Sequence, residues 1–192
     1  MSAAPAPGRG FLKRWRADRA LRRNAMTYVR SLQSEPEEGE VRFVAEHVTA
    51  GDVDHARWEL RYARRALGLL TAERDALDDR TASAVSRALG ESIESDRQID
   101  STKRPVAQRQ LNDRLYAYRL ALANREAHVP TATRLARTLL TFGGGAILED
   151  PRAMEQLGGM LAKYMLDSNQ RLRDVFGTAE LPEDVAPSKI RS

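Results

Sequence analysis

Apolar residues recur with the spacing of an α-helix along most of this chain. Between residues 11 and 33 they return every three or four positions with no intervening glycine or proline, and similar spacing follows in 37–50, 53–95, 105–128, 130–142 and 151–176. No run of β-branched residues has the length of a strand, and no unit of 20–50 residues repeats. The pattern predicts an all-α protein, an irregular helical bundle of about six helices.

Short polar signals mark where these helices begin and end. Residues 34–36 (Ser-Glu-Pro) break the first helix, and the glutamates that follow favour a new one. Gly51 ends that helix and Asp52 caps the next. Pro105 and the pair Asp150–Pro151 are typical of a helix start. We therefore expect helices to begin near residues 37, 53, 105 and 151.

The longest periodic stretch follows a heptad pattern from Val53 to Ala88. As a single helix reaching Ser95 it would measure about 65 Å, longer than a compact bundle of this mass needs. The apolar register slips after residues 78–81, which suits a break into a helical hairpin. One long helix and a hairpin both fit the pattern, and the apolar face could pack within one chain or between two copies in a homo-oligomer.

Two further features predict how the later helices pack. The helix expected over residues 105–128 carries two apolar stripes, which is typical of a central helix. One stripe consists of Leu111, Leu115, Tyr118 and Leu122, and the other of Tyr116, Leu120, Ala123 and Ala127. Three glycines at 143–145 predict a tight bend or hinge, and Gly158 and Gly159 predict that a neighbouring helix approaches closely.

The ends of the chain differ in composition from the rest. Residues 1–10 are small and rich in proline, so we expect a disordered arm. Residues 177–192 contain two prolines and only three sizeable apolar anchors, Leu181, Val185 and Ile190, and we expect a flexible C-terminal tail. The expected organisation is an arm (1–10), a basic amphipathic helix (11–33), a helical bundle core (37–176) and a tail (177–192).

The amino-acid composition narrows the kinds of protein to which this chain could belong. The 192 residues are 42% hydrophobic and 30% charged, which is typical of a folded domain. Cysteine is absent, which excludes disulfides and thiolate chemistry and fits a reducing compartment. The N-terminus lacks the apolar core of a secretory signal, and no apolar run has the length of a membrane span. We expect a cytoplasmic protein.

Positive charge is concentrated near the N-terminus. Residues 9–30 contain eight lysines or arginines and one aspartate, a local charge of +7 within a net charge of +4, so the remainder carries −3. Of the 31 basic residues only four are lysine, an excess of arginine that a GC-rich genome would also produce. The basic residues of this helix lie largely opposite its apolar stripe.

This basic amphipathic helix is the strongest candidate for a binding surface. Arginine and tryptophan are enriched in binding hot spots, and arginine forms bidentate contacts with carboxylates and phosphates. The predicted partner-binding residues are Trp15, Arg16, Arg19, Arg22 and Arg23. An acidic protein partner or assembly is the first expectation, and nucleic acid or an anionic membrane surface are the alternatives. The structural alternative is a bundle helix with a solvated basic face.

No motif predicts a catalytic, cofactor or metal site. The chain has three histidines, and His55 and Glu59, four residues apart, are expected to form a solvent-facing ion pair. The order Asp75, Asp78, Asp79 superficially resembles a diphosphate-binding aspartate motif, but acidic residues at a helix terminus explain it more simply. We expect a non-enzymatic helical adaptor or accessory subunit. The alternatives are a nucleic-acid-binding regulator, a peripheral membrane-surface protein, and a small-molecule enzyme or carrier with a pocket inside the bundle.

Overall fold

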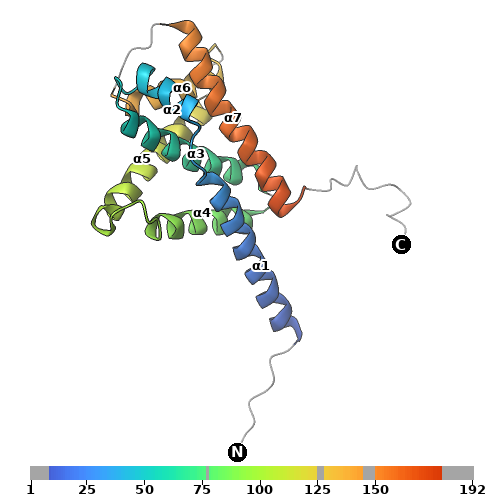
Figure 1. The fold of residues 1–192 in the computed structure, drawn as a ribbon. Coiled ribbons are helices and arrows are strands. Elements are labelled where there is room, and N and C mark those ends of the chain that lie inside the picture. Colours follow the sequence, from blue (N-terminus) through green and yellow to red (C-terminus); the bar gives the residue numbers. More distant parts are fainter. Residues whose placement is uncertain (1–8, 77, 125–127, 145–149, 179–192) are drawn as a thin grey trace, which may run out of the picture.

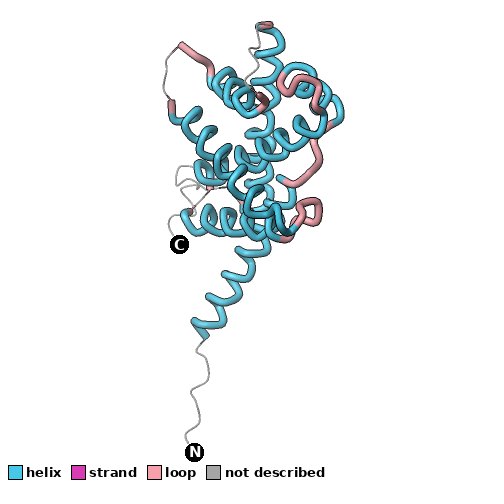
Figure 2. The backbone as a smooth tube through the Cα atoms, turned by 90° about the vertical axis from the view of Figure 1, so that its left-hand side faces the viewer, coloured by secondary structure: helices cyan, strands magenta, loops and turns pink. Residues whose placement is uncertain are grey.

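A computed structural model describes residues 9–76, 78–124, 128–144 and 150–178. These residues form seven α-helices and one turn of 3-10 helix, with no strand among them, which confirms the all-α bundle (Figures 1 and 2). In chain order the elements are α1 (Arg9–Leu32), α2 (Glu38–His47), α3 (Val53–Asp75), α4 (Asp79–Glu94), η1 (Ser101–Lys103), α5 (Arg104–Ala123), α6 (Thr131–Phe142) and α7 (Pro151–Phe176).

The centre of the bundle is α3. Thirteen of its residues are buried, on all sides of the helix, and it packs against α1, α2, α4, α5, α6 and α7 (Figure 1). A helix with buried residues on every side must be covered by neighbours on every side. The expectation that residues 105–128 form the central helix is wrong. That helix, α5, ends at Ala123 and leaves Tyr116 and Leu120 63% and 52% exposed, because no described helix covers its second apolar stripe.

The heptad stretch from Val53 forms a helical hairpin rather than one long helix. α3 ends at Asp75, and α4 begins at Asp79. The Asp78 carboxylate accepts a hydrogen bond of 2.7 Å from the Thr81 amide and caps α4. The break allows α4 to turn back against α3 and α1, so the apolar positions on both sides of it are buried in one chain.

Other helix ends agree with their sequence signals. Asp52 accepts from the His55 amide at 2.9 Å, and Asp150 accepts from the Arg152 amide at 2.9 Å. α2 begins with a capping box between Glu37 and Glu40. α1 begins at Arg9, two residues before the expected start, while residues 1–8 of the expected arm lie outside the described residues.

The second half of α1 is fixed against α3. Tyr28 is fully buried and its hydroxyl donates a hydrogen bond of 2.8 Å to the Gly68 carbonyl. A Cβ at Gly68 would clash with the Leu32 side chain, so a larger residue there would force Leu32 to move. The same hydrophobic cluster includes α1 residues from Ala25 onward, so this half of the helix is part of the core.

The glycine predictions are confirmed in part. A Cβ at Gly158 would lie 2.7 Å from the Ala132 carbonyl oxygen, so α6 and α7 do approach closely there. Gly159 has open space around its Cα, and its predicted role is wrong, because it faces away from α6. Gly143 ends α6 and packs against Val48, and Gly144 has a φ of +114°, as a tight bend requires. Gly145 lies outside the described residues.

In the described part of the chain, none of the helices combines the length and apolarity needed to cross a bilayer. α7 ends at Phe176, and Gly177 follows it with a φ of +87°. The tail anchors Leu181, Val185 and Ile190 lie outside the described residues.

Candidate partner-binding surface on the N-terminal helix

The two halves of α1 have different surroundings. Ala25, Tyr28 and Val29 are at most 1% exposed. The first half of the helix instead projects away from the bundle in both views (Figures 1 and 2), and every residue from 14 to 19 is exposed. Because α1 extends past the helices it packs against, its amphipathic pattern continues beyond its last neighbour.

The five residues predicted to bind a partner all lie on the exposed part of α1. Trp15 is 52% exposed, and Arg16, Arg19, Arg22 and Arg23 are also exposed. The Arg19 guanidinium lies 5.5 Å from the centroid of the Trp15 ring, a cation–π contact. The structure therefore brings the Trp15 and Arg19 side chains together.

The remaining three arginines divide into two groups. Arg22 Nη2 lies 3.4 Å from Glu91 Oε1 of α4, so it is oriented toward the bundle. Arg16 and Arg23 make no ion pair with any described residue. At 100° per residue these two point about a quarter turn away from Trp15 and Arg22. Their charges are therefore free to meet a partner on a second face of the helix.

A groove of about 450 Å³ lies between α1 and α4, beside this surface. Leu21, Met26, Ala84 and Ala88 provide apolar lining. Charged residues of both signs surround it, and Asp18 pairs with Arg80 at 2.6 Å. The helical repeat places Trp15 on the same side of α1, about one turn beyond Asp18. The sequence does not indicate that α4 contributes to this surface, because the contribution arises only from the packing of α1 against α4.

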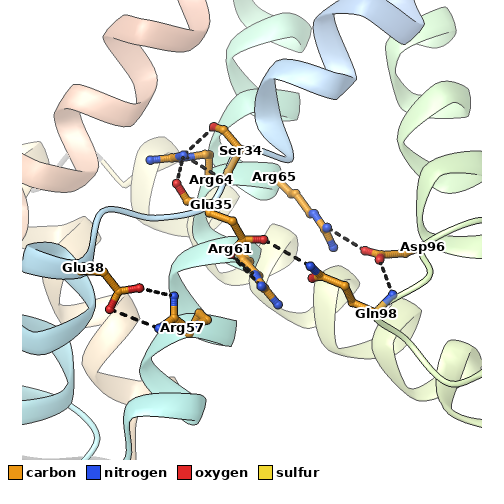
Figure 3. A network of polar contacts seen from close by, with 9 residues as sticks. All are labelled: Ser34, Glu35, Glu38, Arg57, Arg61, Arg64, Arg65, Asp96 and Gln98. Carbon is orange, nitrogen blue, oxygen red and sulfur yellow. Dashed lines mark hydrogen bonds and ion pairs between the residues drawn. The ribbon is translucent and has the colours of Figure 1, made fainter.

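A second group of arginines lies on α3 and is engaged by the fold itself (Figure 3). Arg57, Arg61 and Arg65 pair with Glu38, Glu35 and Asp96, with shortest distances of 2.8, 2.6 and 2.9 Å, while Arg64 donates to the Ser34 carbonyl and hydroxyl. These bonds join α3 to the α1–α2 connection, to α2 and to the start of the α4–α5 connection. The row of arginines on α3 is therefore structural.

The pair His55 and Glu59 differs from its prediction. His55 Nε2 lies 3.3 Å from Glu59 Oε1, which confirms the contact. Glu59 is only 2% exposed, however, so the solvent-facing description is wrong. Arg114 of α5 accounts for this, because its guanidinium donates to both Glu59 oxygens and neutralises the carboxylate inside the bundle. No spacing in the sequence links residues 59 and 114.

The three aspartates at the α3–α4 turn, Asp75, Asp78 and Asp79, have separate structural roles. Asp75 is bonded to Arg74 and to Asn169, and these hydrogen bonds lower the pKa of Asp75 despite partial burial. Asp78 caps α4, and Asp79 is in the first turn of that helix. No group of three acidic, histidine or cysteine side chains suited to a metal ion occurs among the described residues.

Comparisons with known proteins assign the chain to no family. No family model matches it, and no curated protein or solved structure is significantly similar to it. The proposal below therefore rests on the geometry of this chain's own residues.

Proposed function

We propose that the protein is a non-enzymatic helical adaptor or accessory subunit that binds an acidic protein partner through the projecting half of α1. The observation that carries the proposal is Trp15, half exposed on a helix that extends beyond its last neighbour. Burial of a large exposed aromatic side chain by a partner gains free energy, in proportion to the apolar area removed from water. Tryptophan and arginine together are the residue types that dominate binding hot spots.

The surroundings of Trp15 favour a protein partner over a polyphosphate. Asp18, Asp79 and Glu91 line the adjoining groove together with Arg22, Arg80 and Arg87, so the groove has no excess of positive charge to attract a phosphate backbone. The apolar lining of that groove offers nothing to phosphates, whereas it suits the apolar face of a helix. The same balance of charge gives the groove no attraction for an anionic membrane surface.

The geometry suits an acidic amphipathic helix laid beside α1. Its apolar residues would cover Trp15 and enter the α1–α4 groove, and its carboxylates would meet Arg16 and Arg23, which the fold leaves unpaired among the described residues. Arginine presents a planar fork of donors that a carboxylate accepts in a bidentate manner. Apolar burial would supply most of the affinity, and the arginines would supply orientation and association rate.

The test is affinity capture from the protein's own cell lysate at two salt concentrations, with nuclease and detergent controls. Deleting α1 would be uninformative, because Tyr28 and its neighbours are part of the core. The full chain is compared instead with Trp15→Ala and with the double variant Arg16→Glu/Arg23→Glu. Tyr116→Ala is the matched control, since Tyr116 is an aromatic residue on α5 that is more than half exposed, as Trp15 is.

The proposal requires that an acidic protein be captured by the full chain and by Tyr116→Ala, and that both α1 variants lose it. The purified partner should then bind Trp15→Ala about 30-fold more weakly, the effect of a hot-spot residue worth about 2 kcal/mol. Capture that nuclease abolishes would assign nucleic acid instead, and capture that detergent abolishes would assign a membrane surface. Capture unaffected by the α1 variants would overturn the proposal.

A further inference from the structure

A second open pocket, of about 640 Å³, lies between α3, α5 and the connection that contains η1. This volume is within the range of small-molecule sites. One wall is aromatic: the Trp58 and Tyr62 rings, one turn apart on α3, have centroids 5.8 Å apart. Ile99, Val106 and Ala107 add apolar lining from the connection and α5. The pocket therefore offers apolar surface to a planar molecule.

Polar contacts hold this wall in place. Arg114, already fixed by Glu59, lies with its guanidinium 5.0 Å from the Tyr62 ring centroid. The Tyr62 hydroxyl donates a hydrogen bond of 2.9 Å to Gln110 Oε1, and burial raises the pKa of this phenol, which keeps it in the neutral, donating form. On the other side, the Arg61 guanidinium lies 4.8 Å from the Trp58 ring centroid. The wall is preorganised, so little ordering would be needed on binding.

Most of the polar groups left over in the pocket are donors. Among the described residues, no hydrogen-bond partner is found for the Lys103 ammonium or the Trp58 indole N–H, and the Gln110 side chain uses only its oxygen. Most acceptors are occupied instead. Glu59 accepts from Arg114 with both carboxylate oxygens, and Asp100 accepts from the Thr102 amide and hydroxyl with Oδ1. Asp100 Oδ2 and Gln98 Oε1 are the acceptors of the lining that keep no partner among the described residues. A ligand rich in acceptors, with a carboxylate placed at Lys103 and away from Asp100, would complement this set.

We infer that the pocket between α3 and α5 binds a small planar anion, an aromatic carboxylate in chemical class. The aromatic wall of Trp58 and Tyr62 would take the ring system, and Lys103 would meet the carboxylate at the mouth of the pocket. This site is separate from the α1 surface, since the two share no residue.

The test uses 2-naphthoate and its uncharged counterpart 2-naphthalenemethanol as probes of the full chain. In a Trp15→Phe background Trp58 is the only tryptophan, so its indole N–H gives a single NMR signal. That signal should shift saturably with 2-naphthoate. Lys103→Glu should weaken naphthoate binding roughly tenfold, a difference of about 1.4 kcal/mol, and leave binding of the alcohol unchanged. Lys163→Glu, on the exposed side of α7, is the matched charge reversal and should change neither.

Lys103 is exposed, so its variant is expected to retain the fold, and a thermal melt confirms this before binding is measured. The inference is overturned if the Trp58 signal does not shift, if Lys103→Glu and Lys163→Glu weaken naphthoate equally, or if the alcohol binds as tightly as naphthoate to the parent chain. None of these outcomes depends on whether Trp15 binds a protein partner, because every sample carries Trp15→Phe.

Discussion

α1 and α3 are both rich in arginine, yet their arginines have opposite surroundings. On α3, Arg61 and Arg65 point at carboxylates of other elements and are largely buried. On α1, Arg16 and Arg23 are exposed and make no ion pair with described residues. The side chains are the same, and the difference comes from position, because α3 lies between six other helices while α1 runs past its last neighbour. Arginine abundance therefore indicates binding only where the fold leaves the charge unpaired.

The largest effect is expected where a charge pair is most deeply buried. Arg114→Met should lower the free energy of unfolding by about 3–5 kcal/mol, because it leaves the Glu59 carboxylate buried without its partner. The measurement is urea unfolding at neutral pH. The double variant Glu59→Leu/Arg114→Met should recover most of the loss, since no unpaired charge remains. Equal losses in the single and double variants would show that the pair is not what stabilises this contact.

The next effect tests whether the buried half of α1 depends on its close approach to α3. Gly68→Ala should destabilise the protein by about 1–3 kcal/mol, because the added methyl group meets the Leu32 side chain. Gly90→Ala is the control: it lies inside α4 with open space around it, and should be neutral or stabilising by up to about 1 kcal/mol. Thermal unfolding of both variants gives the comparison. A neutral Gly68→Ala would mean that α1 is not packed tightly against α3.

A smaller effect is expected for the partly exposed pair of Arg61 and Glu35. Burial alone would raise the pKa of Glu35, but hydrogen bonds from Arg61 lower it overall. A carboxylate with a lowered pKa adds stability above its unfolded pKa and loses it as the pH falls through the folded pKa. A double-mutant cycle with Arg61→Gln and Glu35→Gln should give a coupling of about 0.2–1 kcal/mol at pH 7 that disappears in acid. A coupling that persists when Glu35 is protonated would contradict this assignment.

The smallest effect on stability is expected on the projecting half of α1. Arg16→Gln and Arg23→Gln should each change the free energy of unfolding by less than about 0.5 kcal/mol, because neither side chain contacts the core. Denaturant unfolding measures this directly. A loss as large as that of Arg114→Met would show that these arginines are structural, like those of α3, and would remove the contrast between the two helices.

The sequence alone was sufficient for most of the helices and where they begin, although it left open whether residues 53–95 form one helix or two. Each helix is specified locally, by apolar spacing and by capping residues such as Asp52, Asp78 and Asp150 that act on the next few amides. The basic character of the first helix and the placement of Trp15 and Arg16 on different faces of it also followed from the sequence, because an amphipathic pattern depends on a single helix.

Only the tertiary structure decided which apolar faces are covered and which charges are paired. Tyr116 and Leu120 have the spacing of core residues, but no described helix covers them. Gly158 and Gly159 are adjacent and identical, and only the first faces α6. Glu59 is buried because Arg114, 55 residues away in the chain, reaches it from α5. Local spacing determines which face a residue occupies on its own helix, whereas burial and pairing depend on what lies opposite that face, and that is set by how the helices cross.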